Sequence, residues 1–145
     1  NGHTVLGDGG GICQVSTTVF RAAIYAGLPI KERKNHSFPV RYYNPQGFDS
    51  TVYPGVVDLK FVNDTPNHIL IQGYVVKNKL TFEIYGTNDG RKVAVEHPTT
   101  YDAKPDGSLK AYFNRTITTA SGQEIKNKFT SIYKPPVKYE SNPLE

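Results

Sequence analysis

The pattern of apolar and polar positions predicts one helix near the start of the chain. Residues 12–26 contain no glycine or proline, and their apolar residues recur at the three- and four-residue spacing of a helix. These residues are Ile12, Val15, Val19, Ala22, Ala23 and Ala26. Further apolar side chains occupy the opposite side, so we expect a helix that is buried on most faces. Gly27, followed by Leu28 and Pro29, is typical of a helix C-terminus.

After residue 37 the pattern changes to the two-residue alternation of strands. Clusters of Asn, Asp, Gly and Pro, which favour turns, separate the alternating segments. The predicted strands cover residues 57–61, 69–75, 80–84, 92–96, 109–119 and 123–133. We therefore predict an α+β fold with one buried N-terminal helix packed on a mainly antiparallel β-sheet, and a strand-rich C-terminal half.

Length and composition fit one domain, which we place at residues 1–133 and follow with an extended tail over 134–145. The chain has 145 residues, of which 37% are hydrophobic and 21% charged, so it can bury a core and is not expected to be disordered. It begins Asn-Gly-His, without a methionine or a signal segment. We therefore expect an excised piece of a longer protein whose upstream part is missing.

The charge and the longest apolar runs exclude some partners. The net charge of +4 is spread thinly, without the clustered basic stripe of a nucleic-acid-binding protein, so no nucleic acid is expected as a partner. No apolar run approaches the roughly 20 residues of a membrane-spanning helix. Membrane attachment is therefore expected only through parts outside this chain.

The sharpest chemical feature is the single cysteine, Cys13, which follows the glycines of residues 9–11 with only Ile12 between them. One cysteine excludes a disulfide framework within the chain. The glycine run places Cys13 in the first turn of the predicted helix, where free N–H groups and the helix dipole favour a thiolate. The same N–H groups can stabilise an oxyanion. Our candidates for oxyanion or substrate binding are Gly11, Gln14 and Ser16.

A reactive thiol also needs a base and a group that orients the base. His36 follows the helix at an expected strand edge, and Asp49 follows His36 in the sequence Gly-Phe-Asp-Ser-Thr-Val. Cys13 as nucleophile, His36 as general base and Asp49 as orienter would form the set that thiol acyl transfer requires. Asp58 is a second candidate for the orienter, although it lies on the outward phase of a predicted strand.

Structural roles for the same residues remain open. Cys13 can be a buried core residue, because free cysteine is among the most buried residue types. His36 can hydrogen-bond a backbone carbonyl, and Asp49 can be an ordinary turn residue. A low-pKa thiol would also suit a redox sensor. The remaining histidines lack ligand partners at suitable spacing and the glycine run lacks a phosphate-loop sequence, so we expect no metal and no cofactor.

Several motifs together resemble the VanW-like family. They are Gly9-Gly10-Gly11-Ile12-Cys13-Gln14-Val15-Ser16-Thr17-Thr18, Ala26-Gly27-Leu28, Glu32-Arg33, His36-Ser37, Pro39-Val40, Asp49-Ser50-Thr51-Val52 and Asp58-Leu59-Lys60-Phe61. Phe48 departs from the family pattern, which has an arginine there. The order of cysteine, helix, histidine and aspartate also resembles, more loosely, the transglutaminase-like and papain-like cysteine cores.

The resemblance implies a compartment more than a reaction. VanW-like proteins are bacterial, mostly Gram-positive, exported or membrane-anchored, and named after a gene of vancomycin-resistance clusters. It implies an extracellular location at the cell surface or cell wall and a peptidoglycan or wall-peptide partner. We therefore expect either a peptidase or transpeptidase-like enzyme that acts on peptidoglycan stem peptides or surface proteins, or a non-catalytic wall-binding or scaffolding module.

Overall fold

The fold was analysed in a computed structural model that describes residues 11–136. It confirms an α+β architecture with antiparallel strand pairing throughout these residues. The elements are α1 (Ile12–Tyr25), β1 (Ile30–Glu32), the 3₁₀ helix η1 (Arg41–Tyr43), β2 (Lys60–Phe61), β3 (Leu70–Val76), β4 (Lys79–Tyr85), β5 (Lys92–Val95), β6 (Thr99–Tyr101), β7 (Leu109–Thr118) and β8 (Glu124–Tyr133). Gly9, Gly10 and most of the predicted tail lie outside the described residues.

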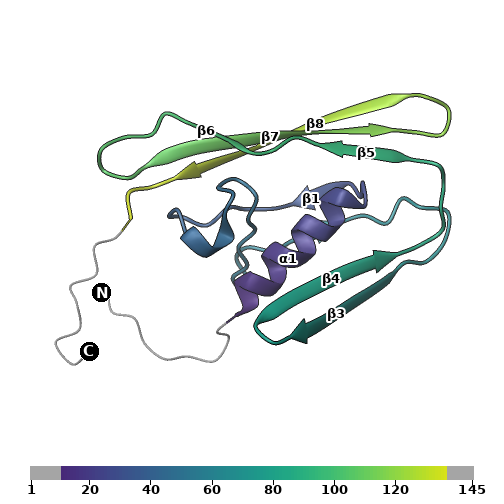
Figure 1. Ribbon diagram of the computed structural model, residues 1–145, viewed down its shortest axis with the longest axis horizontal. Coiled ribbons are helices and arrows are strands. Elements are labelled where there is room, and N and C mark those ends of the chain that lie inside the picture. The colour runs from purple at the N-terminus through teal and green to yellow at the C-terminus, as the bar shows by residue number, and fades with distance from the viewer. Residues whose placement is uncertain (1–10, 137–145) are drawn as a thin grey trace.

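Helix α1 lies between two layers of strands (Figure 1). The sheet of β5 to β8 covers one side of the helix, and the hairpin of β3 and β4 covers the other side. The short pair β1–β2 and the irregular segment that carries η1 lie at the level of the helix, beneath the sheet. The helix is therefore the central element to which both β layers are attached.

The C-terminus of α1 ends as the sequence predicts. Gly27 has a φ of 71°, in the left-handed region that glycine adopts most readily. Leu28 N–H donates to the Ala23 carbonyl at 3.0 Å, and Gly27 N–H donates to the Ile24 carbonyl at 3.1 Å. These two hydrogen bonds define a Schellman motif, which satisfies carbonyls that the helix itself leaves free.

A buried arginine completes this helix end. Arg115 on β7 is 2% exposed, and its guanidinium donates to the carbonyls of Ile24 and Leu28. Asn127 on β8 accepts two further hydrogen bonds from it. The negative end of the helix dipole faces this cation, so Arg115 stabilises the contact between α1 and the sheet.

The buried face of α1 differs from the predicted one. Ile12 and Val15 are 45% and 42% exposed, whereas Ser16 and Thr17 are buried. The hydroxyls of Ser16 and Thr17 donate to the Ser50 carbonyl, so polar side chains occupy the inner face of the first two turns. Hydrogen bonding to an irregular segment thus decides which side of the helix start faces inward.

The sheet is built around the long hairpin of β7 and β8. β5 and β6 both pair with the other edge of β7, and they act as one strand that is interrupted at residues 96–98. The register changes by one residue there, as at a β-bulge, and Pro98 has no N–H for the ladder. The three-residue strand β6 was not predicted from the sequence.

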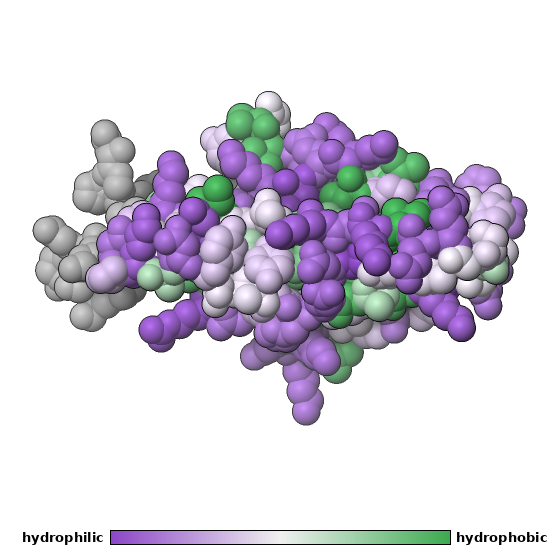
Figure 2. Space-filling view, turned by 90° about the horizontal axis from the view of Figure 1, so that it is seen from above, coloured by the Kyte–Doolittle hydropathy of each residue, from purple (hydrophilic) through white to green (hydrophobic). Residues whose placement is uncertain are grey.

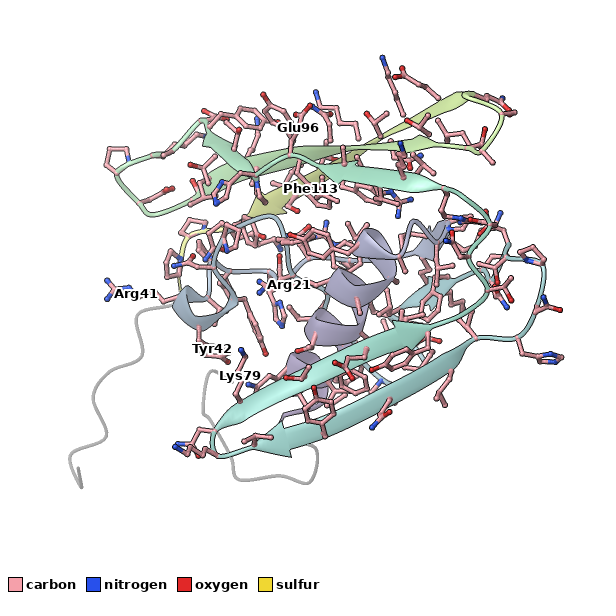
Figure 3. The ribbon with its side chains drawn as sticks, turned by 45° about the vertical axis from the view of Figure 1, so that its right-hand side comes forward. Arg21, Arg41, Tyr42, Lys79, Glu96 and Phe113 are labelled. Carbon is pink, nitrogen blue, oxygen red and sulfur yellow. The ribbon has the colours of Figure 1, made fainter. Side chains whose placement is uncertain are left out.

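The two faces of this sheet differ in polarity. In Figure 3, Phe113 points from β7 toward α1 and Glu96 lies on the opposite face. The outer face, seen from above in Figure 2, is largely hydrophilic. Inner-facing residues Ala111, Phe113, Arg115 and Ile117 of β7 are buried, and this alternation fixes the strand register.

Aromatic side chains form the centre of the core. Phe20 of α1 makes edge-to-face contacts with Phe48, Phe113 and Phe129, at centroid distances of 6.0, 6.4 and 6.2 Å. Phe113 and Phe129 stack across β7 and β8 at 4.8 Å. This cluster joins the helix, the sheet and the irregular segment into one core.

The middle of the chain is less regular than predicted. The strand expected at residues 57–61 is reduced to β2, with an isolated bridge between Tyr53 and Val57. His36, expected at a strand edge, lies in an irregular segment just after the bridge between Lys34 and Thr51. Side-chain hydrogen bonds replace the strand pairing in this part of the chain, as described below.

Prediction for the helix end. Gly27→Ala is expected to lower the free energy of unfolding by about 3 kcal/mol, because a left-handed alanine is strained and its Cβ would lie 2.8 Å from Val93 Cγ2. Gly122→Ala is the matched control, since Gly122 has a φ of 86° and open space around it. The control should lose about 1 kcal/mol. Chemical denaturation measures both, and equal losses would contradict the close packing at Gly27.

Candidate functional site

Cys13 lies in the first turn of α1, as the second residue after the N-cap Gly11. Gly11 has a left-handed φ of 96° and supplies no side-chain cap, and the first turn contains no acidic residue. The first hydrogen bond of the helix runs from Val15 N–H to the Gly11 carbonyl. The N–H groups of residues 12–14 therefore have no acceptor within the helix.

The thiol contacts a neighbouring extended segment. Cys13 Sγ lies 3.4 Å from Thr51 Oγ1 and 3.7 Å from the Val52 carbonyl oxygen, and the side chain is half-buried. Burial raises the pKa of Cys13, but the hydrogen bonds with Thr51 and the Val52 backbone and the interaction with His36 bring the pKa below its usual value. The site thus favours the thiolate.

His36 is held by Asp49 at two points. Asp49 Oδ2 accepts a hydrogen bond from the His36 backbone N–H at 2.8 Å and lies 2.6 Å from His36 Nδ1. Asp49 is 2% exposed, so this carboxylate is removed from water. Burial lowers the pKa of His36, but Asp49 and then Cys13 raise it, and the balance lies above the usual value.

The arrangement leaves Nε2 of His36 available for the thiol. Nε2 is buried and has no hydrogen-bond partner among the described residues. Cys13 and His36 interact closely enough that each moves the other's pKa toward the charged form. The structure therefore pairs His36 with Asp49 and places Cys13 against Thr51, two residues after Asp49 in the same segment.

The other oxygen of Asp49 has two further donors. The Tyr133 hydroxyl donates to Oδ1, and Arg33 Nη2 lies 3.3 Å from the same atom. Tyr133 also accepts a hydrogen bond from Gly47 N–H at 2.7 Å. Burial raises the pKa of Asp49, but hydrogen bonds from His36 and Tyr133 and the charge of Arg33 bring it below its usual value.

Arg33 fixes the irregular segment in place through several hydrogen bonds. Its guanidinium donates to the backbone carbonyls of Gly47, Asp49 and Thr130, and to the Ser131 hydroxyl. It also lies over the Phe20 ring, with 5.1 Å between Cζ and the centroid. The site segment is therefore fixed to both the core and β8 without regular strand pairing.

The segment that contacts the thiol is fixed to α1 by two hydroxyls. Ser16 and Thr17 donate to the Ser50 carbonyl, and Ser50 N–H donates to Thr17 Oγ1 at 3.1 Å. Because side chains alternate along an extended segment, Asp49 and Thr51 point to the same side, toward His36 and Cys13.

The three residues proposed for oxyanion or substrate binding differ in position. Gly11 is the N-cap beside the free N–H groups, and Gln14 is exposed on the first turn. Ser16 is buried and its hydroxyl is engaged with Ser50, so its observed contact is structural. The backbone N–H groups of the first turn are the donors nearest to Cys13 in the chain.

Asp58, the second candidate for the orienter, does not lie against His36. It is exposed, its Oδ1 accepts a hydrogen bond from Leu59 N–H, and its Oδ2 lies 4.0 Å from Lys60 Nζ. Residues 11–136 contain no cluster of three or more His, Cys, Asp or Glu residues suited to a metal ion. None of the helices in this part of the chain is long and apolar enough to cross a membrane.

Four residues of the site were not assigned a role from the sequence. They are Arg33, Tyr43, Thr51 and Tyr133. The two-residue spacing from Asp49 was a usable signal for Thr51. Tyr133 follows Asp49 by 84 residues, and no local pattern indicates such a contact.

Comparison with known proteins identifies the family. The family model "VanW like protein" matches residues 1–85. The chain belongs to the VanW-like family. YoaR, an uncharacterized protein of Bacillus subtilis, is 40% identical over 87 residues, which are 60% of this chain and 28% of YoaR. The vancomycin B-type resistance protein VanW of Enterococcus faecalis is 31% identical over 97 residues, 64% of this chain and 30% of that protein.

The chain spans less than a third of the length of these two relatives. No solved structure matches it significantly. The family match ends at β4, whereas Tyr133, Thr130 and Ser131 of β8 contact the site. The part of this VanW-like chain beyond the family match therefore helps to build the site.

Prediction for the thiol. The rate of Cys13 alkylation against pH is expected to report a thiolate that titrates below the free value of about 8.5. His36→Ala should raise this pKa, because the imidazolium that favours the thiolate is lost. Cys13 is the only cysteine, so the labelling site is unambiguous. Slow labelling in the folded protein and fast labelling after unfolding would show instead an inert core cysteine.

Prediction for the buried carboxylate. The pKa of Asp49 is lower in the folded than in the unfolded chain, so its stabilising contribution is present above the unfolded value of about 3.9 and is lost as pH falls through the folded value. Asp49→Asn should lower the free energy of unfolding by about 3 kcal/mol at pH 7, since Arg33 loses its buried partner. Urea denaturation between pH 3 and 7 should show a smaller pH dependence in the variant. An unchanged pH dependence would contradict the lowered pKa.

Proposed function

We propose that this domain uses Cys13 for acyl transfer in the bacterial cell envelope, on peptidoglycan stem peptides or on surface proteins. The observation that carries the proposal is the pairing of His36 with the buried carboxylate of Asp49 close to the half-buried thiol of Cys13. Asp49 Oδ2 lies 2.6 Å from His36 Nδ1, and Thr51, two residues after Asp49, lies 3.4 Å from Cys13 Sγ. A structural cysteine needs no such arrangement.

In the first step the thiolate attacks the carbonyl carbon of a peptide bond. His36 Nε2 holds the proton taken from Cys13, and the carbonyl oxygen becomes an oxyanion near the free N–H groups of residues 12–14. The tetrahedral intermediate then collapses, the C–N bond breaks, and the leaving amine takes the proton from His36. The products are an amine and a thioester on Cys13.

In the second step a nucleophile attacks the thioester. Water gives hydrolysis and an amine gives transpeptidation; in each case His36 accepts the proton of the nucleophile. The C–S bond then breaks, and the proton returns from His36 to the Cys13 sulfur, so the site is regenerated. Both reactions use the same residues.

A groove beside the thiol suits an extended substrate. A cavity of about 480 Å³ is lined by Val52, Glu32, Asp58 and Lys60, among others, and Val52 also contacts Cys13. Tyr53 and Val56, next in the chain, are 66% and 74% exposed. Val52 thus links this cavity to the thiol, which supports the cavity as the place where a peptide would lie.

The name of one relative supports a location in the cell envelope. The Enterococcus protein is named for resistance to vancomycin, a glycopeptide antibiotic, and a wall peptide is a substrate class consistent with that name. We place the domain outside the cell, at the surface or in the wall, with peptidoglycan or a wall peptide as its partner. No metal or cofactor takes part in the proposed steps.

Prediction for the reaction. Incubation with peptidoglycan stem peptides should release or exchange an amine, as detected by mass spectrometry, and a thioester on Cys13 should be trapped. Cys13→Ser should lose the activity with its melting temperature maintained. Asp49→Asn should reduce the rate at least about a hundredfold, since the base loses its orienter. Glu96→Gln is the control, because Glu96 is exposed on the outer face of the sheet and its carboxylate accepts a hydrogen bond from Asn114, and it should retain full activity.

Full activity of Cys13→Ser would exclude the mechanism. Binding of the wild-type protein to purified peptidoglycan with no released or exchanged product would favour a non-catalytic wall-binding module. Either outcome would rule out acyl transfer by Cys13.

A further inference from the structure

The aromatic ring of Tyr43 covers one face of the His36 imidazole. The ring centroids are 4.5 Å apart and the planes differ by 21°, which is a stacked arrangement. Tyr43 is 7% exposed, whereas its neighbour Tyr42 on η1 is 75% exposed. Tyr43 is therefore an inward-facing member of η1 that lies against the base of the site.

Helix α1 holds the backbone of Tyr43 in place through Arg21. Arg21 Nη2 donates to the Tyr43 carbonyl at 2.6 Å, and Nε donates to the Phe48 carbonyl at 2.7 Å. In Figure 3, Arg21 extends from α1 toward η1, where Arg41 and Tyr42 are labelled. The guanidinium also lies over the Phe48 ring, 5.2 Å from its centroid. Tyr43 is thus anchored to the same helix that carries the nucleophile.

The two contacts of the imidazole have different physical roles. Asp49 holds one edge of the ring at Nδ1, and Tyr43 covers one face. A cation over the face of an aromatic ring is attracted by the negative potential of that face. The stack therefore favours protonated His36, which is the form that accompanies a thiolate at Cys13.

We propose that Tyr43 is a positioning residue that stabilises the protonated His36 imidazole and thereby the thiolate of Cys13. The ring acts through His36, and the stack also limits rotation of the imidazole away from the sulfur. The effect on the thiol rests on the proposed function, in which His36 is the base for Cys13. The effect on His36 itself does not depend on the proposed function.

The test compares Tyr43→Leu, which removes the aromatic face, with Tyr43→Phe, which keeps it. Tyr85→Leu is the control, because Tyr85 lies on β4, is 51% exposed, and its hydroxyl donates to Glu83. Two quantities are measured: the pKa of His36 by NMR titration of its ring protons, and the rate of Cys13 alkylation by iodoacetamide at pH 7. Neither requires a substrate.

Tyr43→Leu should lower the pKa of His36 and slow alkylation about tenfold, within the range expected for a partly desolvated cation–π contact. Tyr43→Phe and Tyr85→Leu should resemble the wild type in both measurements. If Tyr43→Leu fails to fold, Tyr43→Met, which retains an apolar side chain without a ring, replaces it with the same expected result.

Other outcomes overturn the proposal or the function separately. An unchanged His36 pKa in Tyr43→Leu would overturn the role of the stack. Equal losses in Tyr43→Phe and Tyr43→Leu would assign the effect to the hydroxyl and also overturn it. The third outcome is a lowered His36 pKa in Tyr43→Leu together with an alkylation rate that is the same in the wild type and in His36→Ala. It would support the role of the stack and reject Cys13 and His36 as a catalytic pair.

Discussion

The buried carboxylate of Asp49 is the interaction on which the site depends. It is 2% exposed, and an unpaired charge at such a position would cost several kcal/mol. The cost is offset because Oδ2 has both the backbone and the ring of His36 as partners, and Oδ1 has Tyr133 and Arg33. The requirement to satisfy one carboxylate thus brings His36, the long hairpin and the irregular segment to one point.

Arginine side chains hold the backbone in place where regular strand pairing is absent. Between β1 and β2 the described chain has a 3₁₀ helix and isolated bridges but no longer strand. Arg21 and Arg33 donate to backbone carbonyls across that segment, and Arg115 does the same at the end of α1. Each guanidinium also lies over a phenylalanine ring of the core. Fixed donors and apolar stacking together allow an irregular backbone to hold a defined geometry.

Local patterns revealed the helix, its end at Gly27 and most strands, because periodicity and turn residues leave a signal over a few positions. The residues Cys13, His36 and Asp49 were proposed from chemical type and order; the structure pairs His36 with Asp49, and Thr51 of the same segment contacts Cys13. The roles of Arg33 and Tyr133 were not predicted, since they arise from contacts with distant residues that the neighbouring sequence does not encode. The short strand β6 and the polar inner face of the helix start were missed for a related reason: pairing and hydrogen bonds override local preference.

The position of Tyr133 decides when, during synthesis, the hydrogen bonds around Asp49 can all form. Among the described residues, Cys13 belongs to the first element in chain order, whereas the hydroxyl that completes the shell of Asp49 belongs to the last strand. A nascent chain therefore carries its thiol through most of synthesis before the carboxylate shell beside His36 can close. The surroundings of His36 and Asp49 are therefore complete only after β8 has been synthesised.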